Sequence, residues 1–442
     1  MSNLLQEETV SRIASFDAID VYTIRTDKFK TSSISVFFHT NLDRERVTKN
    51  AMIPAVLRRG CRRFPTFREI ALHLEELYGA TFDCGVTKMG ERHIIQFYIE
   101  FVSEMFTEEG SNQFDRAFDL LYEIITQPVL ENEVFKDEYV KQEKDNLKQL
   151  IESRVNDKML YAVEKCLEET CRDEPYGIYD YGFVSDLKDI NAQNLYEQYT
   201  AMLKTYPVQV YIAGSASDKS VEKAIEKLKN LRPKTGGDFG DLADNKLFGP
   251  SQESFNKSIT KVRNVVERFS VNQGKLSLGF RTNTRPGSKE YYALMVYNGI
   301  LGGGVHSKLF QNVREKASLA YYAFSRLEKF KGLMVISSGI EIANKDRALE
   351  IILQQIDEIK AGNISDYEFE STIKTIETSV KSLRDNQLQI VTHYLGQSIA
   401  NTNDTFDDLI RKTSQVTIQE VVDVAKRIQL DTIYFLTSKE QA

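Results

Sequence analysis

The sequence has few of the residues that build metal centres and disulfide frameworks. It contains only five histidines and four cysteines in 442 residues. No two histidines have the H-E-x-x-H or H-x-x-E-H spacing, which places two ligands one helical turn apart with a base beside them. No C-x-x-C pair occurs, so reduced thiols are expected rather than disulfides. The sequence therefore predicts neither a bound metal nor another cofactor.

Signals for a membrane, for secretion and for nucleotide binding are also missing. No run approaches the 18 apolar residues of a transmembrane helix, and the N-terminus lacks a basic stretch followed by an apolar one. Neither a G-x-S-x-G elbow nor a P-loop spacing is present. The net charge of -7 argues against nucleic acid as the main partner. These absences predict a cytoplasmic protein whose partners are neither membranes nor nucleic acids.

What the sequence does contain is an internal repeat. Residues 33–41 and 275–283 share an alternating apolar pattern that is typical of half-buried strands. An apolar helical stretch follows each strand, at residues 50–57 and 291–300. The alternating positions are Ile34, Val36 and Phe38 in the first copy and Leu276, Leu278 and Phe280 in the second.

The repeat predicts two homologous domains, each of the α+β class with helices segregated from a sheet. Residues 231–255 are rich in glycine, proline and aspartate, which is typical of a linker. We therefore expect an N-terminal domain over residues 1–230 and a C-terminal domain over residues 256–442.

One helix of the first domain can be predicted in detail. Thr66 and Glu69 have the spacing of a capping box, and Gly79 is expected to end the helix. Apolar residues recur between them at helical spacing, which predicts a face turned to the core. The residues of this face are Phe67, Ile70, Leu74, Leu77 and Tyr78.

A basic cluster precedes this helix. Cations stabilise the C-terminal end of a helix, so we interpret the cluster as a solvated helix end rather than an anion site. The cluster consists of Arg58, Arg59, Arg62 and Arg63. The residues alone thus predict a large two-repeat α+β protein without an evident catalytic site.

Several longer segments resemble the M16 (insulinase/pitrilysin-type) peptidases. LGGGVHSKLFQNVREKASLAYYAFS, at residues 301–325, resembles the glycine-led helix and V-R-E-K-x-x-L-A-Y segment of their second half. Residues 58–101 resemble the segment that follows the zinc helix in their first half. Further matching segments are 115–128 and PYG at 175–177, while 27–34, 142–149 and 156–162 resemble an inactive subgroup of bacterial members. The resemblance implies two M16-type domains related by duplication.

The resemblance also implies that the zinc motif is lost. Active members carry H-x-x-E-H shortly before a glycine, and alignment on Gly60 places this motif at residues 51–55. Ala51 and Ala55 occupy the histidine positions, and Pro54 occupies the position of the glutamate base. Neither alanine nor proline can coordinate a metal or transfer a proton.

The third zinc ligand of active members is a glutamate on a later helix. Alignment on Glu143 places it at Leu150, beyond an insertion near residues 103–113. Pro54 carries a further expectation: because proline lacks a backbone N–H, its helix should begin near it or kink there.

By contrast, the residues that contact substrate in active members are retained. An arginine and a tyrosine of their second half help to hold the peptide and the developing oxyanion, and the matching residues are Arg314 and Tyr321. A guanidinium and a phenol can both donate to a carbonyl oxygen that gains charge. The alternative is structural, with Arg314 as a surface charge of a helix and Tyr321 as a core residue of a strand.

The resemblance leads to three hypotheses about function. The first is a catalytically inactive M16 subunit that pairs with an active H-x-x-E-H paralogue and supplies contacts to a peptide or unfolded polypeptide. The assembly would be a heterodimer, with a homodimer as the other arrangement. The second is a peptide-binding or structural scaffold without a role in proteolysis, and the third is a weak cryptic metallopeptidase. On the first two hypotheses the chain is not an enzyme by itself.

Overall fold

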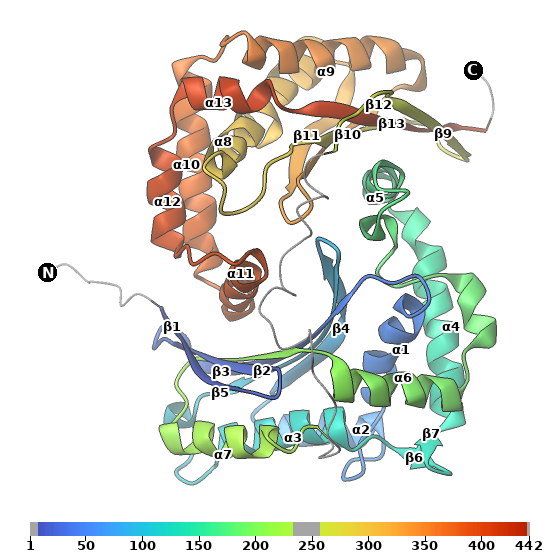
Figure 1. Ribbon diagram of the computed structural model, residues 1–442, viewed down its shortest axis with the longest axis vertical. Coiled ribbons are helices and arrows are strands. Elements are labelled where there is room, and N and C mark those ends of the chain that lie inside the picture. Colours follow the sequence, from blue (N-terminus) through green and yellow to red (C-terminus); the bar gives the residue numbers. More distant parts are fainter. Residues whose placement is uncertain (1–7, 233–256, 440–442) are drawn as a thin grey trace, which may run out of the picture. The chain divides into compact units, whose positions relative to one another are not determined.

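The computed structural model describes residues 8–232 and 257–439, which form two compact units (Figure 1). Within these described residues, unit 1 comprises 8–153, 179–232 and 386–395, and unit 2 comprises 154–178, 257–385 and 396–439. Residues 233–255 of the expected linker lie outside the described residues. The domain boundaries given by residues 1–230 and 256–442 therefore stay a prediction.

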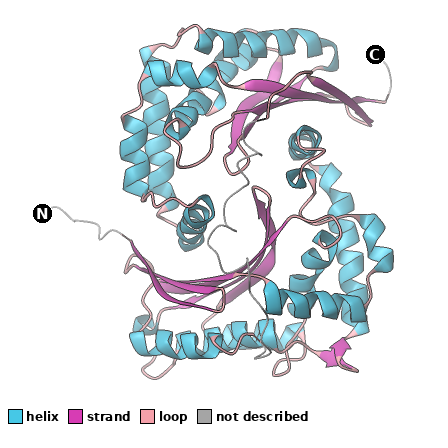
Figure 2. Cartoon of the chain, in the orientation of Figure 1, coloured by secondary structure: helices cyan, strands magenta, loops and turns pink. Residues whose placement is uncertain are grey.

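Unit 1 is built on a mixed sheet whose strand order is β1-β2-β8-β3-β5-β4. Helices cover one face of this sheet (Figure 2). The strands are β1 (Thr9–Phe16), β2 (Ile19–Arg25), β3 (Thr31–Asn41), β4 (Thr81–Met89), β5 (Arg92–Val102) and β8 (Val208–Ala213), with a separate pair β6 (Leu130–Glu131) and β7 (Val134–Phe135). The helices are α1 (Val47–Leu57), α2 (Phe67–Glu76), α3 (Gln113–Thr126), α4 (Asp137–Ser153), α6 (Ala192–Thr205) and α7 (Asp218–Leu228), with short 3₁₀ turns η1 (Glu104–Phe106) and η4 (Val184–Asp189).

Unit 2 contains a second sheet, with strand order β11-β12-β10-β13-β9. Its strands are β9 (Arg263–Phe269), β10 (Gly274–Arg281), β11 (Ala320–Glu328), β12 (Leu333–Ile340) and β13 (Gln429–Ser438). Its helices are α5 (Lys158–Thr170), α8 (Tyr291–Gly302), α9 (Lys345–Lys360), α10 (Asp366–Leu383), α12 (Phe406–Ser414) and α13 (Ile418–Ala425), with short turns η2 (Arg154–Asn156), η3 (Pro175–Gly177) and η9 (Ile342–Asn344) and a π-helical turn η8 (Phe310–Lys316).

The two sheets have the same topology. Reading unit 2 as β9-β13-β10-β12-β11 matches β2-β8-β3-β5-β4 of unit 1 strand for strand. The parallel pairs also correspond, since β2 runs parallel to β8 and β9 runs parallel to β13. Strand β1 is an addition at one edge of unit 1. The predicted α+β class and internal duplication are therefore confirmed.

The alternating apolar residues that revealed the repeat face the helices. In β3, Ile34, Val36 and Phe38 belong to the main core of unit 1. In β10, Leu276, Leu278 and Phe280 take the same positions in the core of unit 2. Because side chains alternate across a strand, the residues between them face the other side of each sheet.

Each unit contains a segment that comes from the other half of the sequence. Residues 154–178 come from the first half of the chain, but their helix α5 packs against β10, β12 and β13 of unit 2 (Figure 1). Conversely, the first half of α11 (Gln387–Ala400) belongs to unit 1, where the Gln387 amide donates to the Thr31 carbonyl at 2.6 Å. Ser33 Oγ in turn donates to Gln387 Oε1 at 2.8 Å. Each sheet therefore carries a segment from the other half of the sequence.

Helix α2 follows its sequence prediction in part. The Thr66–Glu69 capping box is present in both directions, and Ile70 and Leu77 are buried. The helix ends at Glu76 rather than at Gly79. Two residues of the predicted core face, Phe67 and Tyr78, are instead about half exposed, at 50% and 48%. Phe67 is the first residue of the helix, and Tyr78 lies two residues beyond its end, in the left-handed backbone region with a φ of 58°.

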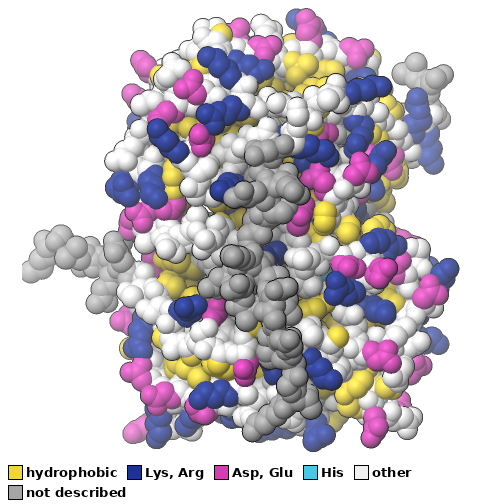
Figure 3. Space-filling view, viewed as in Figure 1, with side chains coloured by type: hydrophobic (Ala, Val, Ile, Leu, Met, Phe, Trp, Pro, Cys, Tyr) yellow, Lys and Arg dark blue, Asp and Glu magenta, His cyan; other side chains and the backbone are white. Residues whose placement is uncertain are grey.

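The described surface is mixed in charge. On the face shown in Figure 3, lysine and arginine side chains are interspersed with aspartate and glutamate. Within residues 8–232 and 257–439, no helix is both long and apolar enough to cross a membrane.

Candidate functional site

Helix α1 carries the positions that the resemblance aligns with the zinc motif. The helix begins at Val47 and runs through Pro54 to Leu57, so it does not begin near Pro54, and the alternative expectation of a kink there stays a prediction. The side chains of Ala51 and Pro54 are buried, and Ala55 is partly buried. Burial against β4, β5, α4 and α6 explains why a helix forms despite the missing N–H donor, because tertiary packing overrides local propensity.

A thiol of strand β4 lies against helix α1. Cys84 on β4 donates from Sγ to the Pro54 carbonyl oxygen at 3.2 Å. Burial raises the pKa of this thiol to about 12. The Cys84 side chain is therefore a neutral thiol at physiological pH in the metal-free chain.

Helix α4 carries Leu150, which the resemblance aligns with the third ligand. Glu143 is buried and forms an ion pair with Arg59, which follows the end of α1. Asn146 Nδ2 donates to the other oxygen of Glu143 at 3.1 Å. Leu150 lies two helical turns farther along the same face and is 45% exposed. The Glu143 carboxylate is thus already neutralised by an arginine.

The basic cluster at the end of α1 is paired with carboxylates. Besides Arg59, Arg58 lies 3.8 Å from Asp83, and Arg63 lies 3.7 Å from Glu123. These exposed pairs fit the interpretation as a solvated helix end, and they leave little unbalanced positive charge for an anion.

The histidines do not converge on a common point. His39 and His93 lie buried on neighbouring strands, and burial lowers the pKa of His39 to about 3 and of His93 to about 4. His73 stacks on Phe64, and His306 Nε2 forms a 2.9 Å hydrogen bond with Thr372 Oγ1. Among the described residues, no group of three or more histidine, cysteine, aspartate or glutamate side chains could hold a metal ion.

Arg314 lies on the π-helical turn η8, a type of helix that is rare and frequent at functional sites. Its side chain is 44% exposed, and its guanidinium lies over the Phe310 ring, 4.6 Å from the ring centre. Its nearest carboxylate, Glu315 Oε1, is 3.6 Å away and exposed. The ring fixes one face of the guanidinium, and several N–H donors stay available to a ligand.

Tyr321 follows seven residues later, at the start of the edge strand β11. It is 55% exposed, so the alternative of a core residue is wrong. Pairing with β12 matches Ala320 to Ile340 and Tyr322 to Gly339, which leaves Tyr321 as the extra residue of a β-bulge. Such bulges redirect a side chain out of the regular alternation. The bulge therefore turns the Tyr321 phenol outward on the strand that η8 contacts.

The glycine run before η8 serves packing rather than phosphate binding. A Cβ atom on Gly302 would lie 2.3 Å from the Ser325 backbone nitrogen, and one on Gly299 would lie 2.4 Å from Thr372 Cγ2. Only glycine lets α8 approach β11 and α10 this closely. Lys308, just beyond the run, is buried and pairs with Glu368 of α10 at 2.9 Å. These contacts set the position from which η8 starts.

A buried charge cluster in unit 2 was not predicted from the sequence. Arg281 on β10 is 1% exposed and donates to Glu174, to Asp431 and to the Thr170 carbonyl. Lys331, also buried, lies 2.7 Å from Glu174. No sequence signal could have revealed the cluster, because its members are distant in the chain and have no characteristic spacing.

These observations define a protein with two copies of one α+β unit and no metal-ligand set at its zinc-motif positions. The family model described as Peptidase M16 inactive domain matches residues 189–376. Over 425 residues the chain is 35% identical to "Probable inactive metalloprotease YmfF" of Bacillus subtilis, which covers 96% of this chain and 97% of that protein. The chain therefore belongs to the M16 peptidase family, and it resembles the inactive members of YmfF type.

Two further comparisons agree with this placement. A solved structure of a conserved protein from Enterococcus faecalis has a TM-score of 0.87 at 30% identity, over 99% of this chain and 100% of that one. A second Bacillus subtilis protein, "Uncharacterized zinc protease YmxG", is 25% identical over 225 residues, or 50% of this chain and 51% of that protein. The chain is thus similar both to an inactive metalloprotease and, more distantly, to a zinc protease.

Proposed function

We propose that this chain is a non-catalytic M16 subunit, which pairs with an active H-x-x-E-H paralogue and presents Arg314 and Tyr321 to the peptide at the paralogue's zinc site. The observation that carries the proposal is the exposure of both side chains, on a π-helical turn and on a β-bulge. Both are irregular backbone features that direct a side chain toward a ligand.

The chemistry of the pair suits a peptide carbonyl. A guanidinium held over an aromatic ring keeps its donors in one plane, and a phenol adds one further donor. Both groups become more effective when the carbonyl oxygen gains negative charge during attack by a zinc-bound water. The chain itself provides no such water, since Ala51, Pro54, Ala55 and Leu150 have no metal-binding atoms in their side chains.

The relatives support a division of labour between two proteins. The same Bacillus subtilis strain has one relative named an inactive metalloprotease and another named a zinc protease. An organism that keeps both kinds of chain can place the metal on one and substrate contacts on the other. The peptide class and the identity of the paralogue are part of the proposal.

The test is peptide turnover by an H-x-x-E-H paralogue from the same organism, measured with and without this chain. We expect turnover to require the intact chain and to fall about 100-fold with Arg314→Ala, the loss typical of one oxyanion donor. Tyr321→Phe should lower turnover by a smaller factor, because it removes one hydroxyl and keeps the ring. Size-exclusion chromatography should show an unchanged complex for both variants.

Arg326→Ala is the matched control, because Arg326 is an exposed arginine on the same strand and pairs with Glu328 at 2.9 Å. It should leave turnover unchanged. A paralogue that is fully active alone would contradict the proposal, and peptide binding without any effect on turnover would favour a scaffold instead. Cleavage by this chain alone, with one zinc bound and sensitivity to chelators, would indicate a cryptic peptidase.

A further inference from the structure

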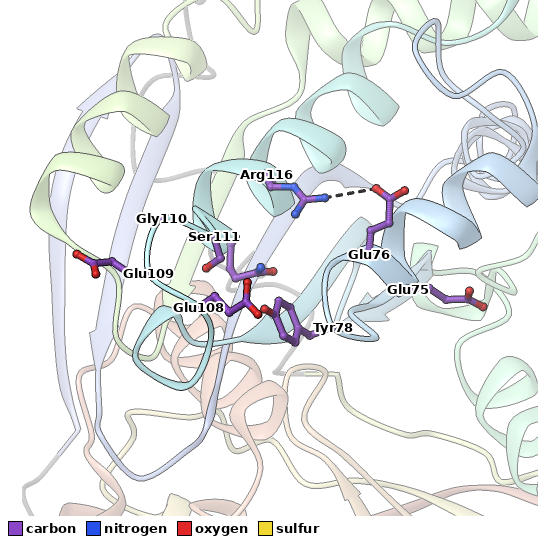
Figure 4. Close-up of a pocket in the computed structure, with 9 residues that line it drawn as sticks. Glu75, Glu76, Tyr78, Glu108, Glu109, Gly110, Ser111 and Arg116 are labelled. Carbon is purple, nitrogen blue, oxygen red and sulfur yellow. Dashed lines mark hydrogen bonds and ion pairs between the residues drawn. The ribbon is translucent and has the colours of Figure 1, made fainter.

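A hollow on unit 1 lies outside the features considered so far. It has a volume of about 450 Å³, within the range of small-molecule sites (Figure 4). The end of α2, the loop after η1 and the start of α3 form its walls. The residues that line it are Glu75, Glu76, Tyr78, Glu108, Glu109, Gly110, Ser111, Gln113 and Arg116.

The hollow is strongly acidic. Four glutamates line it against a single cation, Arg116, whose guanidinium lies 3.5 Å from Glu76. Figure 4 shows Glu76 directed toward Arg116, and Glu108 beside the Tyr78 ring, while Glu75 and Glu109 lie at opposite ends. The region between Glu76, Glu108 and Tyr78 therefore carries an excess of negative charge next to an aromatic face.

A buried amide in the same hollow lacks hydrogen bonds. Gln113 is 0% exposed, and neither its Nε2 nor its Oε1 atom has a hydrogen-bond partner among the described residues. A buried polar group without a partner is unfavourable, and a ligand that forms a hydrogen bond with it removes this penalty. Gln113 lines the hollow together with the exposed side chains of Tyr78 and Glu108.

The chemistry favours an organic cation over a metal ion. Within the described part of the chain, no three acidic, histidine or cysteine side chains are placed to hold a metal. A guanidinium or ammonium group can instead pair with Glu108, lie on the Tyr78 ring and donate to Gln113 Oε1. The loop that supplies Glu108 and Glu109 falls near residues 103–113, where the resemblance implies an insertion, and the hollow contains none of the positions aligned with M16 site residues.

We propose that this hollow binds a guanidinium or ammonium group carried on a flexible aliphatic chain. The group could be the side chain of an arginine or lysine in a peptide, or the end of a free polyamine, since both present the same cation. The site does not depend on a paralogue or on Arg314 and Tyr321. It would give the chain a preference for basic ligands.

Isothermal titration calorimetry of the full chain tests the proposal with three probes. Nα-acetyl-arginine amide represents the peptide side chain, spermidine represents the free polyamine, and Nα-acetyl-citrulline amide is the neutral analogue of the first. We expect at least one cation to bind at one site with a dissociation constant of about 1 mM or lower. The citrulline probe should bind at least tenfold more weakly or not at all.

Two variants locate the site and one serves as a control. Glu108→Gln and Gln113→Leu should each weaken binding about fivefold or more, because they remove a charge and an amide from the hollow. Glu104→Gln removes an exposed charge from the same segment, outside the residues that line the hollow, and should leave binding unchanged. Thermal unfolding establishes that each variant is folded. Glu108 is exposed, so its variant remains informative if Gln113→Leu is destabilised.

The results distinguish the ligand source and decide the proposal. Binding of arginine amide alone indicates a peptide side chain, and binding of spermidine alone indicates a polyamine; either supports the site if Glu108→Gln weakens it. No binding by any cation overturns the proposal. Equal loss with Glu104→Gln, or equal affinity for the citrulline probe, also overturns it, because the effect would then be unspecific attraction to an acidic surface.

Discussion

Arg281 donates two hydrogen bonds to Glu174, from Nη2 to Oε1 at 2.6 Å and from Nη1 to Oε2 at 3.1 Å. Glu174 lies in the segment 154–178 that the first half of the sequence contributes to unit 2, and Arg281 lies on the central strand β10. Lys331 and Lys257 also contact Glu174, at 2.7 and 2.9 Å. One carboxylate thus anchors the exchanged segment to three cations of unit 2.

Removing the charge of Glu174 should destabilise unit 2. Glu174→Gln leaves Arg281 and Lys331 buried with too little negative charge, and breaking such a pair typically costs about 3–5 kcal/mol. We expect a loss of about 3 kcal/mol, measured by urea unfolding. Asp173→Asn is the control, because Asp173 is the adjacent carboxylate but is 76% exposed. Its effect should stay within about 0.5 kcal/mol, and equal effects for both variants would contradict this role of Glu174.

The contribution of Glu174 to the stability of the fold should disappear at acidic pH. Burial by itself raises its pKa, but hydrogen bonds from Arg281, Lys331 and Lys257 outweigh burial and lower the pKa to about 2, from an ordinary 4.5. A carboxylate with a depressed pKa stabilises the fold above its unfolded pKa and loses this effect as the pH falls toward its folded pKa. The difference in melting temperature between the native chain and Glu174→Gln should be constant from pH 7 to about 5.

Below pH 5 the difference in melting temperature between the native chain and Glu174→Gln should narrow, and near pH 2 it should be small. The measurement is a series of thermal melts of both proteins from pH 7 to pH 2.5 in steps of half a unit, at constant ionic strength. Asp173→Asn should show no such convergence. A difference that is independent of pH would mean that Glu174 contributes through its shape rather than its charge.

The thiols should be unreactive in the folded chain. Within the described residues no disulfide is formed; Cys61, Cys166 and Cys171 are buried, and Cys84 is partly buried. Burial raises the pKa of Cys61, Cys84 and Cys166, which suppresses the reactive thiolate. With Ellman's reagent at pH 8, we expect fewer than about one thiol to react within minutes in the native chain, and all four in denaturant. Rapid reaction of the native chain would contradict the burial of these side chains.

Restoring the zinc ligands should restore zinc binding. The change combines Ala51→His, Pro54→Glu, Ala55→His and Leu150→Glu, which supplies the three ligands and the base of active relatives on helices α1 and α4. We expect about one zinc per chain, measured by elemental analysis after dialysis. The control keeps the three α1 changes and places the glutamate at Ile151 instead, which points to another side of α4.

The control should bind zinc at least tenfold more weakly. Equal zinc content for both variants would show that Leu150 is not the third position. Absence of zinc from the first variant would show that the two helices no longer approach as they do in an active relative.

Local signals predicted much of the fold. The capping residue Thr66 and the alternation of Ile34, Val36 and Phe38 depend on neighbours in the sequence, and both predictions are confirmed. The repeat then gave the order of elements in the second unit. Helix α1 was harder to predict. Proline has a low propensity for the interior of a helix, but the helix runs through Pro54, which is buried among strands and helices that the sequence does not reveal.

Features that rest on distant contacts could not be predicted. Tyr321 is exposed because of a bulge in the pairing of β11 with β12, and a pattern of apolar residues in the sequence does not predict a bulge. Tyr78 fits the apolar stripe of α2, but the stripe ends before it. The hollow near Gln113 requires two segments to meet that are separated by a whole hairpin. In each case the decisive partner lies far away in the chain.

The exchange of segments has a consequence for synthesis on the ribosome. Unit 1 receives residues 386–395 only when most of the chain has been translated, and the segment 154–178 has no sheet to cover until the strands of unit 2 exist. The main core of each unit comes from one half of the sequence, but each unit also contains a segment from the other half, so neither unit can be completed until nearly the whole polypeptide has left the exit tunnel. If the gene were cut between the two repeats, the first fragment would lack residues 386–395 of unit 1 and carry residues 154–178 of unit 2. The second fragment would lack residues 154–178 and carry residues 386–395.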